Sequence, residues 1–83
     1  MMSEENLIKL GFEKQEDTSG IKDFYYYTLT ITKGLEFITQ ADDEVIDNQW
    51  IVEVFETETP IMYTDSVELE ILITSLRKHL KHE

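Results

Sequence analysis

The segment from Phe24 to Thr32 constrains the fold of this chain more than any other feature. Its nine residues, FYYYTLTIT, are aromatic, β-branched or leucine, and residues of these kinds favour β-strands. Further runs with strand character, separated by turn or loop residues, lie at 12–16, 35–40, 50–56 and 61–63.

The turn after Thr32 sets the register of the expected sheet. Gly34 suits the left-handed position of a bulged turn, so residues 32–34 are expected to form a three-residue loop. A two-residue loop would shift the parity and scatter the apolar side chains over both faces. The bulged turn predicts the cross-strand pairs Ile31–Leu35, Leu29–Phe37, Tyr27–Thr39, Phe37–Val54 and Thr39–Val52.

With this register the two faces of the sheet differ in character. A core face collects Tyr25, Tyr27, Leu29, Ile31, Leu35, Phe37, Trp50, Val52 and Val54. The opposite face, called the mixed face below, carries Tyr26, Thr28, Thr30, Glu36, Ile38, Gln40, Ile51, Glu53 and Phe55. Its apolar content exceeds that of an ordinary solvated surface, so the mixed face is a candidate site for a partner.

Two helices are expected to complete the domain. Ser3 suits the N-cap of a short first helix, and Gly11 suits its left-handed end. A longer helix is predicted over residues 65–81, opened by Asp65 and Glu68 at capping-box spacing. The sequence therefore predicts one α+β domain over residues 1–83, with a three- to five-stranded antiparallel sheet and both helices packed on one face. The second helix should contact the core face through Leu69, Leu72, Ile73, Leu76 and Leu80, which recur every three or four residues.

Acidic residues dominate the charge of the chain. Asp+Glu number 18 against 7 Lys+Arg, a formal net charge of −11, and eleven carboxylates but no Lys, Arg or His lie between Gly34 and Leu76. Self-repulsion of this size costs stability, so it indicates a need for solubility or an anionic surface for a basic partner. The charge repels phosphates and anionic lipids, so neither nucleic acid nor a membrane is expected as a direct ligand.

The acids divide by their predicted surroundings. Those at helix starts are explained by capping and the helix dipole, but those between residues 42 and 58 lie in a loop and a strand, where no dipole favours them. They either keep strand edges solvated or bind a basic partner, with neighbouring apolar side chains as a desolvated centre. The predicted partner-binding residues are Asp42, Asp43, Glu44, Asp47, Ile51, Glu53, Phe55 and Glu56.

Other chemistry has little support in the sequence. The acids at 42–47 lack the alternation and the glycine of a calcium loop, and His79 and His82 have no third ligand nearby. The chain has no cysteine, and no catalytic motif stands out, so we expect no enzyme activity, no metal and no cofactor. No apolar run reaches the length of a membrane helix, and the N-terminus lacks the basic start of a secretory signal. Cytoplasm is the expected location.

The chain resembles small uncharacterised acidic reading frames of phages and prophages. Their pattern is an N-terminal "L…LGF", a tyrosine-rich strand, "W.VE.F" and an "I.(Y/F)TD" that opens a leucine-rich helix. The matching stretches here are 7–12, 25–30, 50–55 and 61–65. The resemblance implies a phage or mobile-element context, where small acidic proteins include anti-restriction and anti-CRISPR inhibitors that imitate DNA. It implies no activity and no site residue.

Two hypotheses for function follow. The first is a non-enzymatic protein-binding module whose acidic surface occupies the basic site of a host nucleic-acid-binding or defence protein by DNA mimicry. A compact domain of this length is expected to span roughly 30 Å. Duplex DNA of that length carries about 18 phosphate charges, which is comparable to a charge of −11. The alternative is a small adaptor, as a monomer or a homodimer, that associates through a sheet edge or the mixed face. Binding by the first should weaken steeply with salt, and binding by the second should not.

Overall fold

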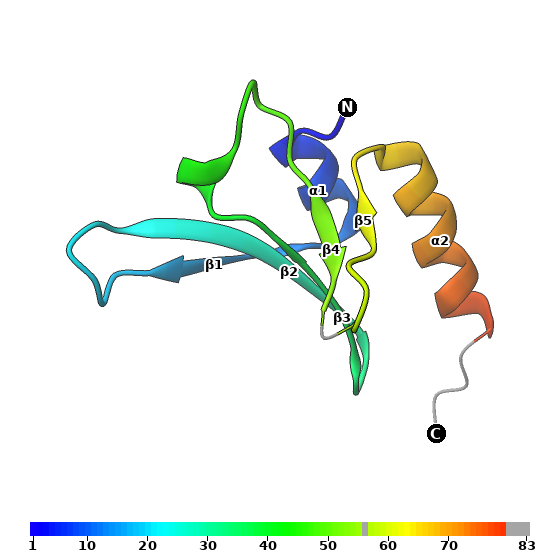
Figure 1. Cartoon of the computed structure of the whole chain (residues 1–83). Coiled ribbons are helices and arrows are strands. Elements are labelled where there is room, and N and C mark those ends of the chain that lie inside the picture. Colours follow the sequence, from blue (N-terminus) through cyan, green and yellow to red (C-terminus); the bar gives the residue numbers. More distant parts are fainter. Residues whose placement is uncertain (56, 80–83) are drawn as a thin grey trace.

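The computed structural model describes residues 1–55 and 57–79, and their strands form one five-stranded antiparallel sheet (Figure 1). The strand order is β1-β2-β3-β4-β5, so every strand pairs with its neighbour in the chain. The predicted α+β class is confirmed. The elements in chain order are α1 (Glu4–Leu10), β1 (Glu13–Asp17), β2 (Phe24–Thr32), β3 (Leu35–Thr39), the 3₁₀ turn η1 (Asp42–Glu44), β4 (Val52–Val54), β5 (Met62–Tyr63) and α2 (Ser66–His79).

The helix α1 begins and ends at the predicted residues. The Asn6 N–H donates to Ser3 Oγ at 3.3 Å and the Ser3 N–H donates to Asn6 Oδ1 at 2.9 Å, which is a reciprocal cap. Gly11 ends the helix with φ 100°, a conformation that glycine adopts without strain. The Phe12 N–H donates to the Leu7 carbonyl at 3.0 Å. Because this bond belongs to the helix end, β1 begins at Glu13 and not at residue 12.

The register of β2, β3 and β4 follows the prediction, except at the turn. Gly34 is left-handed, with φ 88°, but Thr32 pairs directly with Leu35, which leaves a loop of Lys33 and Gly34 only. The ladder shifts between Thr30 and Thr32. The predicted Ile31–Leu35 pair is therefore wrong, because the extra residue lies inside β2 and not in the loop. The predicted pairs Leu29–Phe37, Phe37–Val54 and Thr39–Val52 are confirmed.

Strand β4 is shorter than predicted because backbone donors before it bond elsewhere. The Trp50 N–H donates to the Met2 carbonyl at 2.9 Å, and the Ile51 N–H donates to Gln40 Oε1 at 2.9 Å. Neither residue joins the ladder, so β4 begins at Val52. Strand β5 likewise begins one residue later than predicted, and β3 ends one residue earlier. Glu56, the predicted end of β4, lies outside the described residues.

The core lies between the sheet and the two helices. Phe37 from the centre of the sheet and Leu69 from α2 are both 0% exposed. Leu72 and Leu76 are partly buried at its margin, and Leu80 lies outside the described residues. The predicted core-face residue Leu35 is only partly buried and does not join this cluster. The buried cluster as a whole consists of Met2, Leu7, Phe12, Tyr27, Leu29, Phe37, Trp50, Val52, Leu69 and Ile73.

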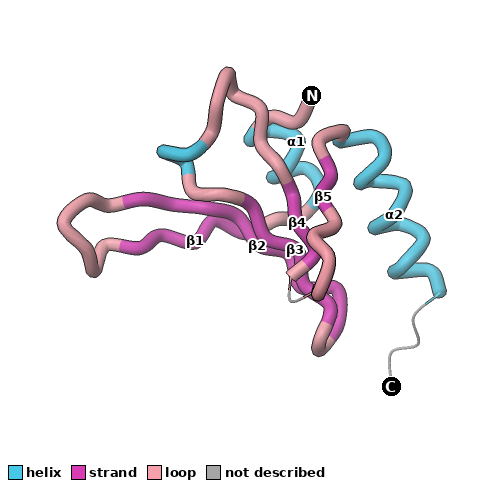
Figure 2. Tube along the Cα trace, viewed as in Figure 1, coloured by secondary structure: helices cyan, strands magenta, loops and turns pink. Residues whose placement is uncertain are grey.

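Both helices pack on the core face of the sheet, and α2 also contacts α1 and β5. Asp65 is the cap of α2, since its Oδ1 accepts the N–H of Val67 at 2.8 Å and of Glu68 at 3.3 Å. The helix itself therefore begins at Ser66, and Lys81, its predicted end, lies outside the described residues. Figure 2 shows the β1–β2 hairpin extending beyond the part of the sheet that lies next to the helices.

Candidate functional site

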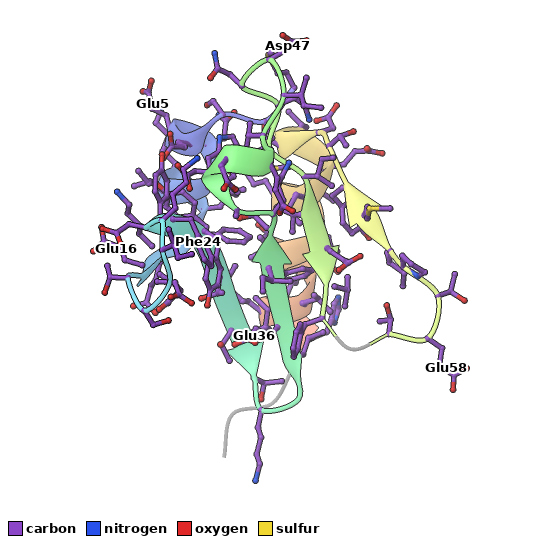
Figure 3. All side chains as sticks on the ribbon, turned by 60° about the vertical axis from the view of Figure 1, so that its left-hand side comes forward. Glu5, Glu16, Phe24, Glu36, Asp47 and Glu58 are labelled. Atoms are coloured by element: carbon purple, nitrogen blue, oxygen red, sulfur yellow. The ribbon has the colours of Figure 1, made fainter. Side chains whose placement is uncertain are left out.

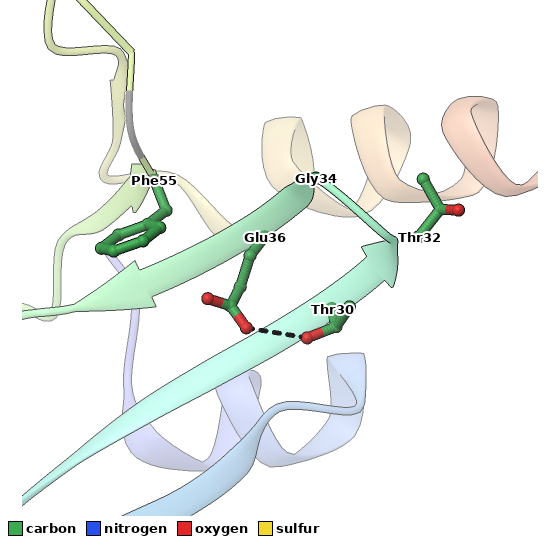
Figure 4. Close-up of a pocket in the computed structure, with 5 residues that line it drawn as sticks. All are labelled: Thr30, Thr32, Gly34, Glu36 and Phe55. Carbon is green, nitrogen blue, oxygen red and sulfur yellow. Dashed lines mark hydrogen bonds between the residues drawn. The ribbon is translucent and has the colours of Figure 1, made fainter.

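The mixed face lies on the side of the sheet away from both helices. Figure 4 shows Thr30, Glu36 and Phe55 in front of the sheet and the helices behind it. A row of paired residues crosses all five strands on this face. Polar side chains occupy the β1, β2 and β4 positions of this row and apolar side chains occupy the β3 and β5 positions, so the row is not a continuous apolar surface. The row is Glu13, Thr28, Ile38, Glu53 and Met62.

A shallow hollow of about 480 Å³ opens on the mixed face, and we call it the mixed-face hollow. Phe55 and Met62 on its wall are 43% and 58% exposed. Among the described residues that line it, the charged ones are Glu44 and Glu53, and both are acids. The residues that line the hollow include Ile38, Gln40, Glu44, Ile51, Glu53, Phe55 and Met62.

A second, more polar hollow of about 340 Å³ adjoins it at Phe55 (Figure 4). The Thr30 hydroxyl donates to Glu36 Oε2 at 2.9 Å across strands β2 and β3. This bond holds the carboxylate of Glu36 against the sheet beside Phe55. The two hollows together place apolar surface and carboxylates side by side over β3 and β4.

Segment 42–49 borders the mixed-face hollow and carries four of the predicted acids, three of which have local partners. Asp42 Oδ1 accepts the N–H of Tyr25 at 3.0 Å, so it ties η1 to β2. Glu44 Oε1 accepts the Ala41 N–H at 3.2 Å across the turn. Asp43 pairs with Lys22, with 3.9 Å between Oδ2 and Nζ, and both side chains are well exposed.

Asp47 lies at the tip of this segment (Figure 3). Asp47 and Asn48 have φ of 54° and 58°, and Ile46 bridges to Gln49 in antiparallel fashion. Two successive left-handed residues between bridged neighbours make a tight hairpin turn, which Asp and Asn tolerate better than other side chains. Asp47 therefore points its charge away from the sheet, where the sequence predicted only an irregular loop.

Aromatic packing holds segment 42–49 at the sheet. The rings of Tyr25 and Tyr27 lie 6.1 and 5.4 Å from the Trp50 ring, and the Tyr27 hydroxyl donates to Glu4 Oε1 at 2.7 Å. Burial raises the pKa of Tyr25, and the Glu4 and Asp42 carboxylates raise it further. The two tyrosine hydroxyls therefore stay protonated. The packed rings form a rigid support for segment 42–49 on the core side of the sheet.

The eight predicted partner-binding residues thus fall into separate groups. Glu44, Ile51, Glu53 and Phe55 meet at the mixed-face hollow. Asp42, Asp43 and Asp47 lie on the same segment without lining it, and Glu56 lies outside the described residues. Met62 is a lining residue that the prediction missed. Residues 61–63 are predicted as a short edge strand, but the sequence does not show that Met62 pairs with Glu53.

Within 1–55 and 57–79, no group of three or more His, Cys, Asp or Glu side chains is arranged to hold a metal ion. In the same residues, neither helix has both the length and the apolar character needed to cross a bilayer.

The site is therefore a partly apolar, partly acidic depression on an open sheet face. The resemblance to phage reading frames remains a prediction. Comparisons of the chain with protein family models, with curated proteins and with solved structures found no match.

Proposed function

We propose that this protein is a non-enzymatic binding module whose mixed face binds a basic, partly apolar segment of a partner protein. The observation that supports this most is the mixed-face hollow, where Phe55 and Met62 stay 43% and 58% exposed while the charged lining residues are acids. A solvated face that served only solubility would need carboxylates but not exposed aromatic and methionine side chains.

The two kinds of side chain have separate roles in the proposed contact. Covering the exposed parts of Phe55 and Met62 removes apolar surface from water, which is worth on the order of 1 kcal/mol for each. Such anchors mainly slow dissociation, whereas the carboxylates at the rim mainly speed association and make it salt-dependent. Glu53 lies in β4 between Ile38 and Met62 of the neighbouring strands, Glu44 lines the same hollow, and the acids of segment 42–49 extend the negative field beyond it.

The narrower hypothesis of DNA mimicry has weaker support. The longest extent of the structure is 42 Å, and duplex DNA of that length carries about 25 phosphates. The chain has a net charge of −11, less than half of that density. The labelled acids in Figure 3 are also spread around the molecule, from Glu16 to Asp47 and Glu58. A basic protein segment of modest length fits this distribution better than a full nucleic-acid channel.

A defined peptide tests the proposal without knowledge of the natural partner. The probe is a synthetic peptide of alternating leucine and lysine, with a leucine–glutamate peptide as control, titrated into isotope-labelled protein at low and high salt. We expect backbone resonance shifts at Ile38, Ile51, Phe55 and Met62 with the first peptide alone, reduced by salt. Shifts spread evenly over all acidic surfaces would contradict a site on the mixed face.

Matched variants separate the anchor from the charges. Phe55→Ala should weaken binding about tenfold through faster dissociation, while Ile46→Ala, at an apolar residue that is even more exposed (75%) but lies outside the hollow, should not. Neutralising the segment with Asp42→Asn, Asp43→Asn, Glu44→Gln and Asp47→Asn should slow association and flatten its salt dependence. Equal effects of Phe55→Ala and Ile46→Ala would remove the apolar centre from the proposal.

A further inference from the structure

Helix α2 presents a solvent-facing stripe that lies opposite its core side. Val67 and Ile71 are 61% and 64% exposed, and Thr74 and Lys78 are exposed as well. These residues follow one another at spacings of four, three and four, which places them on one line along the helix. The core contacts of α2 use Leu69 and Ile73 on the other side, so the stripe has no role in the fold of the single chain.

A depression of about 430 Å³ lies beside this stripe, between α2 and β5, and we call it the α2–β5 hollow. Its lining residues are Tyr63, Glu68, Ile71, Leu72 and Ser75, so it contains one acid. Strand β5 is the last strand of the sheet, and Tyr63 on it lines this hollow, while Met62 lines the mixed-face hollow. Ile71 belongs to both the stripe and the α2–β5 hollow, so the two form one continuous surface.

This surface carries little net charge in a strongly acidic protein. Over residues 59–79, Asp65, Glu68 and Glu70 stand against Arg77 and Lys78, three acids against two bases, a net charge of −1. The rest of the chain therefore carries −10 of the formal net charge of −11. Because like charges oppose the approach of two acidic copies, a second copy can approach with least repulsion at this surface.

We propose that the protein forms a two-fold symmetric homodimer through the stripe of α2 and the α2–β5 hollow. In an antiparallel pair of helices, residues on the same flank meet. Glu70 and Arg77 are seven residues apart, about two turns, so they share one flank, and Glu68 and His79 are eleven apart, about three turns, so they share the other. One symmetric alignment then places Glu70 against Arg77 of the second copy and Glu68 against its His79.

Pairing 70 with 77 and 68 with 79 puts the two-fold axis between positions 73 and 74, so Thr74 is the stripe residue nearest to it. Each Ile71 then faces position 76 of the other copy and lies next to Ser75, which lines that copy's α2–β5 hollow. A two-fold interface is self-complementary by necessity, since the same patch must serve both subunits. The acidic start and basic end of α2 satisfy that condition, whereas the acid-lined mixed face would bring like charges together. The dimer is independent of the proposed binding function, because the two surfaces do not share their central residues.

The assay is sedimentation equilibrium of the full chain from about 1 µM to 1 mM, a range that suits an interface at the small end of known sizes. The expected result is a concentration-dependent rise from the monomer mass of 9.8 kDa to twice that value. Ile71→Glu should raise the dissociation constant at least about 30-fold, because it places an unpaired charge in an apolar contact. Ile8→Glu, equally exposed at 59% but on α1, should leave the dimer unchanged.

Charge reversal provides a test that does not depend on the stripe. Glu70→Arg and Arg77→Glu should each weaken the dimer about tenfold or more, and the double variant should restore it, since the opposite charges then meet again. Thermal melts by circular dichroism confirm that each variant is folded. A protein that stays monomeric at 1 mM, a dimer that survives Ile71→Glu but not Ile51→Glu, or a double variant as weak as the singles would overturn the proposal.

Discussion

Removal of the Asp42 side chain should destabilise the fold through one backbone donor. Asp42 Oδ1 accepts the N–H of Tyr25, 17 residues earlier, at 3.0 Å, and the bond lies in a partly buried position beside the Trp50 ring. Asp42→Ala leaves this donor without its partner, whereas Asp42→Asn retains an acceptor oxygen. Both variants remove the same negative charge, so the difference between them isolates the hydrogen bond.

The expected magnitude follows from that difference. An unsatisfied buried N–H costs about 1–3 kcal/mol, and partial access of water places this site in the lower half of the range. Asp42→Ala should therefore lower the free energy of unfolding by about 1–2 kcal/mol more than Asp42→Asn does. For a domain of this size, that corresponds to a melting temperature lower by about 4–8 °C for each kcal/mol.

Urea unfolding followed by Trp50 fluorescence measures the effect, because this single tryptophan is 3% exposed in the folded chain. Asp43→Ala is the control, since its pair with Lys22 is long and exposed and should be worth less than about 0.5 kcal/mol. The dependence of the free energy of unfolding on urea concentration should be the same for all variants. Identical stabilities of Asp42→Ala and Asp42→Asn would refute a structural role for the carboxylate and return Asp42 to the partner-binding surface alone.

Two further predictions concern the core and its polar margin. Leu69→Ala should cost about 2–5 kcal/mol in urea unfolding, and Leu72→Ala should cost clearly less, because Leu69 is 0% exposed while Leu72 is only partly buried; equal costs would place the core elsewhere on α2. Burial, with the hydrogen bond to Glu4, raises the pKa of Tyr27 far above its ordinary 10.0, so the unfolded chain loses this proton first and stability should fall as pH rises above about 10. In melts at a series of pH values, the stability of Tyr27→Phe should fall less steeply over that range than the stability of the unmodified chain. An equal decline in both would contradict the pKa shift.

Much of the fold could be predicted from local patterns. The pairs Leu29–Phe37 and Phe37–Val54 follow from alternation alone, since a shift by one residue would turn every apolar side chain to the wrong face. The extra residue of the turn was harder to place. A bulge inside β2 and a longer loop preserve the same parity further along the strand, so the pattern of apolar residues cannot distinguish them, and Ile31 was paired wrongly.

The candidate site was predictable in part and for the same reason. Ile51, Glu53 and Phe55 were assigned to the mixed face by alternation, and they line its hollow. The acids of segment 42–49 were grouped by sequence proximity and charge, which contain no information on what each oxygen contacts. Only the packed structure reveals that Asp42 serves the backbone of β2 and that Asp47 sits at a tight turn.

The sequence by itself determined the number and type of elements, the face of each that is buried and the acidity of the surface, because these depend on side-chain period and composition. The tertiary structure decided where β4 begins, since the N–H groups of Trp50 and Ile51 are taken by the Met2 carbonyl and the Gln40 side chain. It also decided that Met62 lies beside Glu53 and that Val67 and Ile71 of α2 stay exposed. Acceptor groups far apart in the sequence can bond to the same backbone N–H, and only the folded structure shows which of them lies close enough to do so.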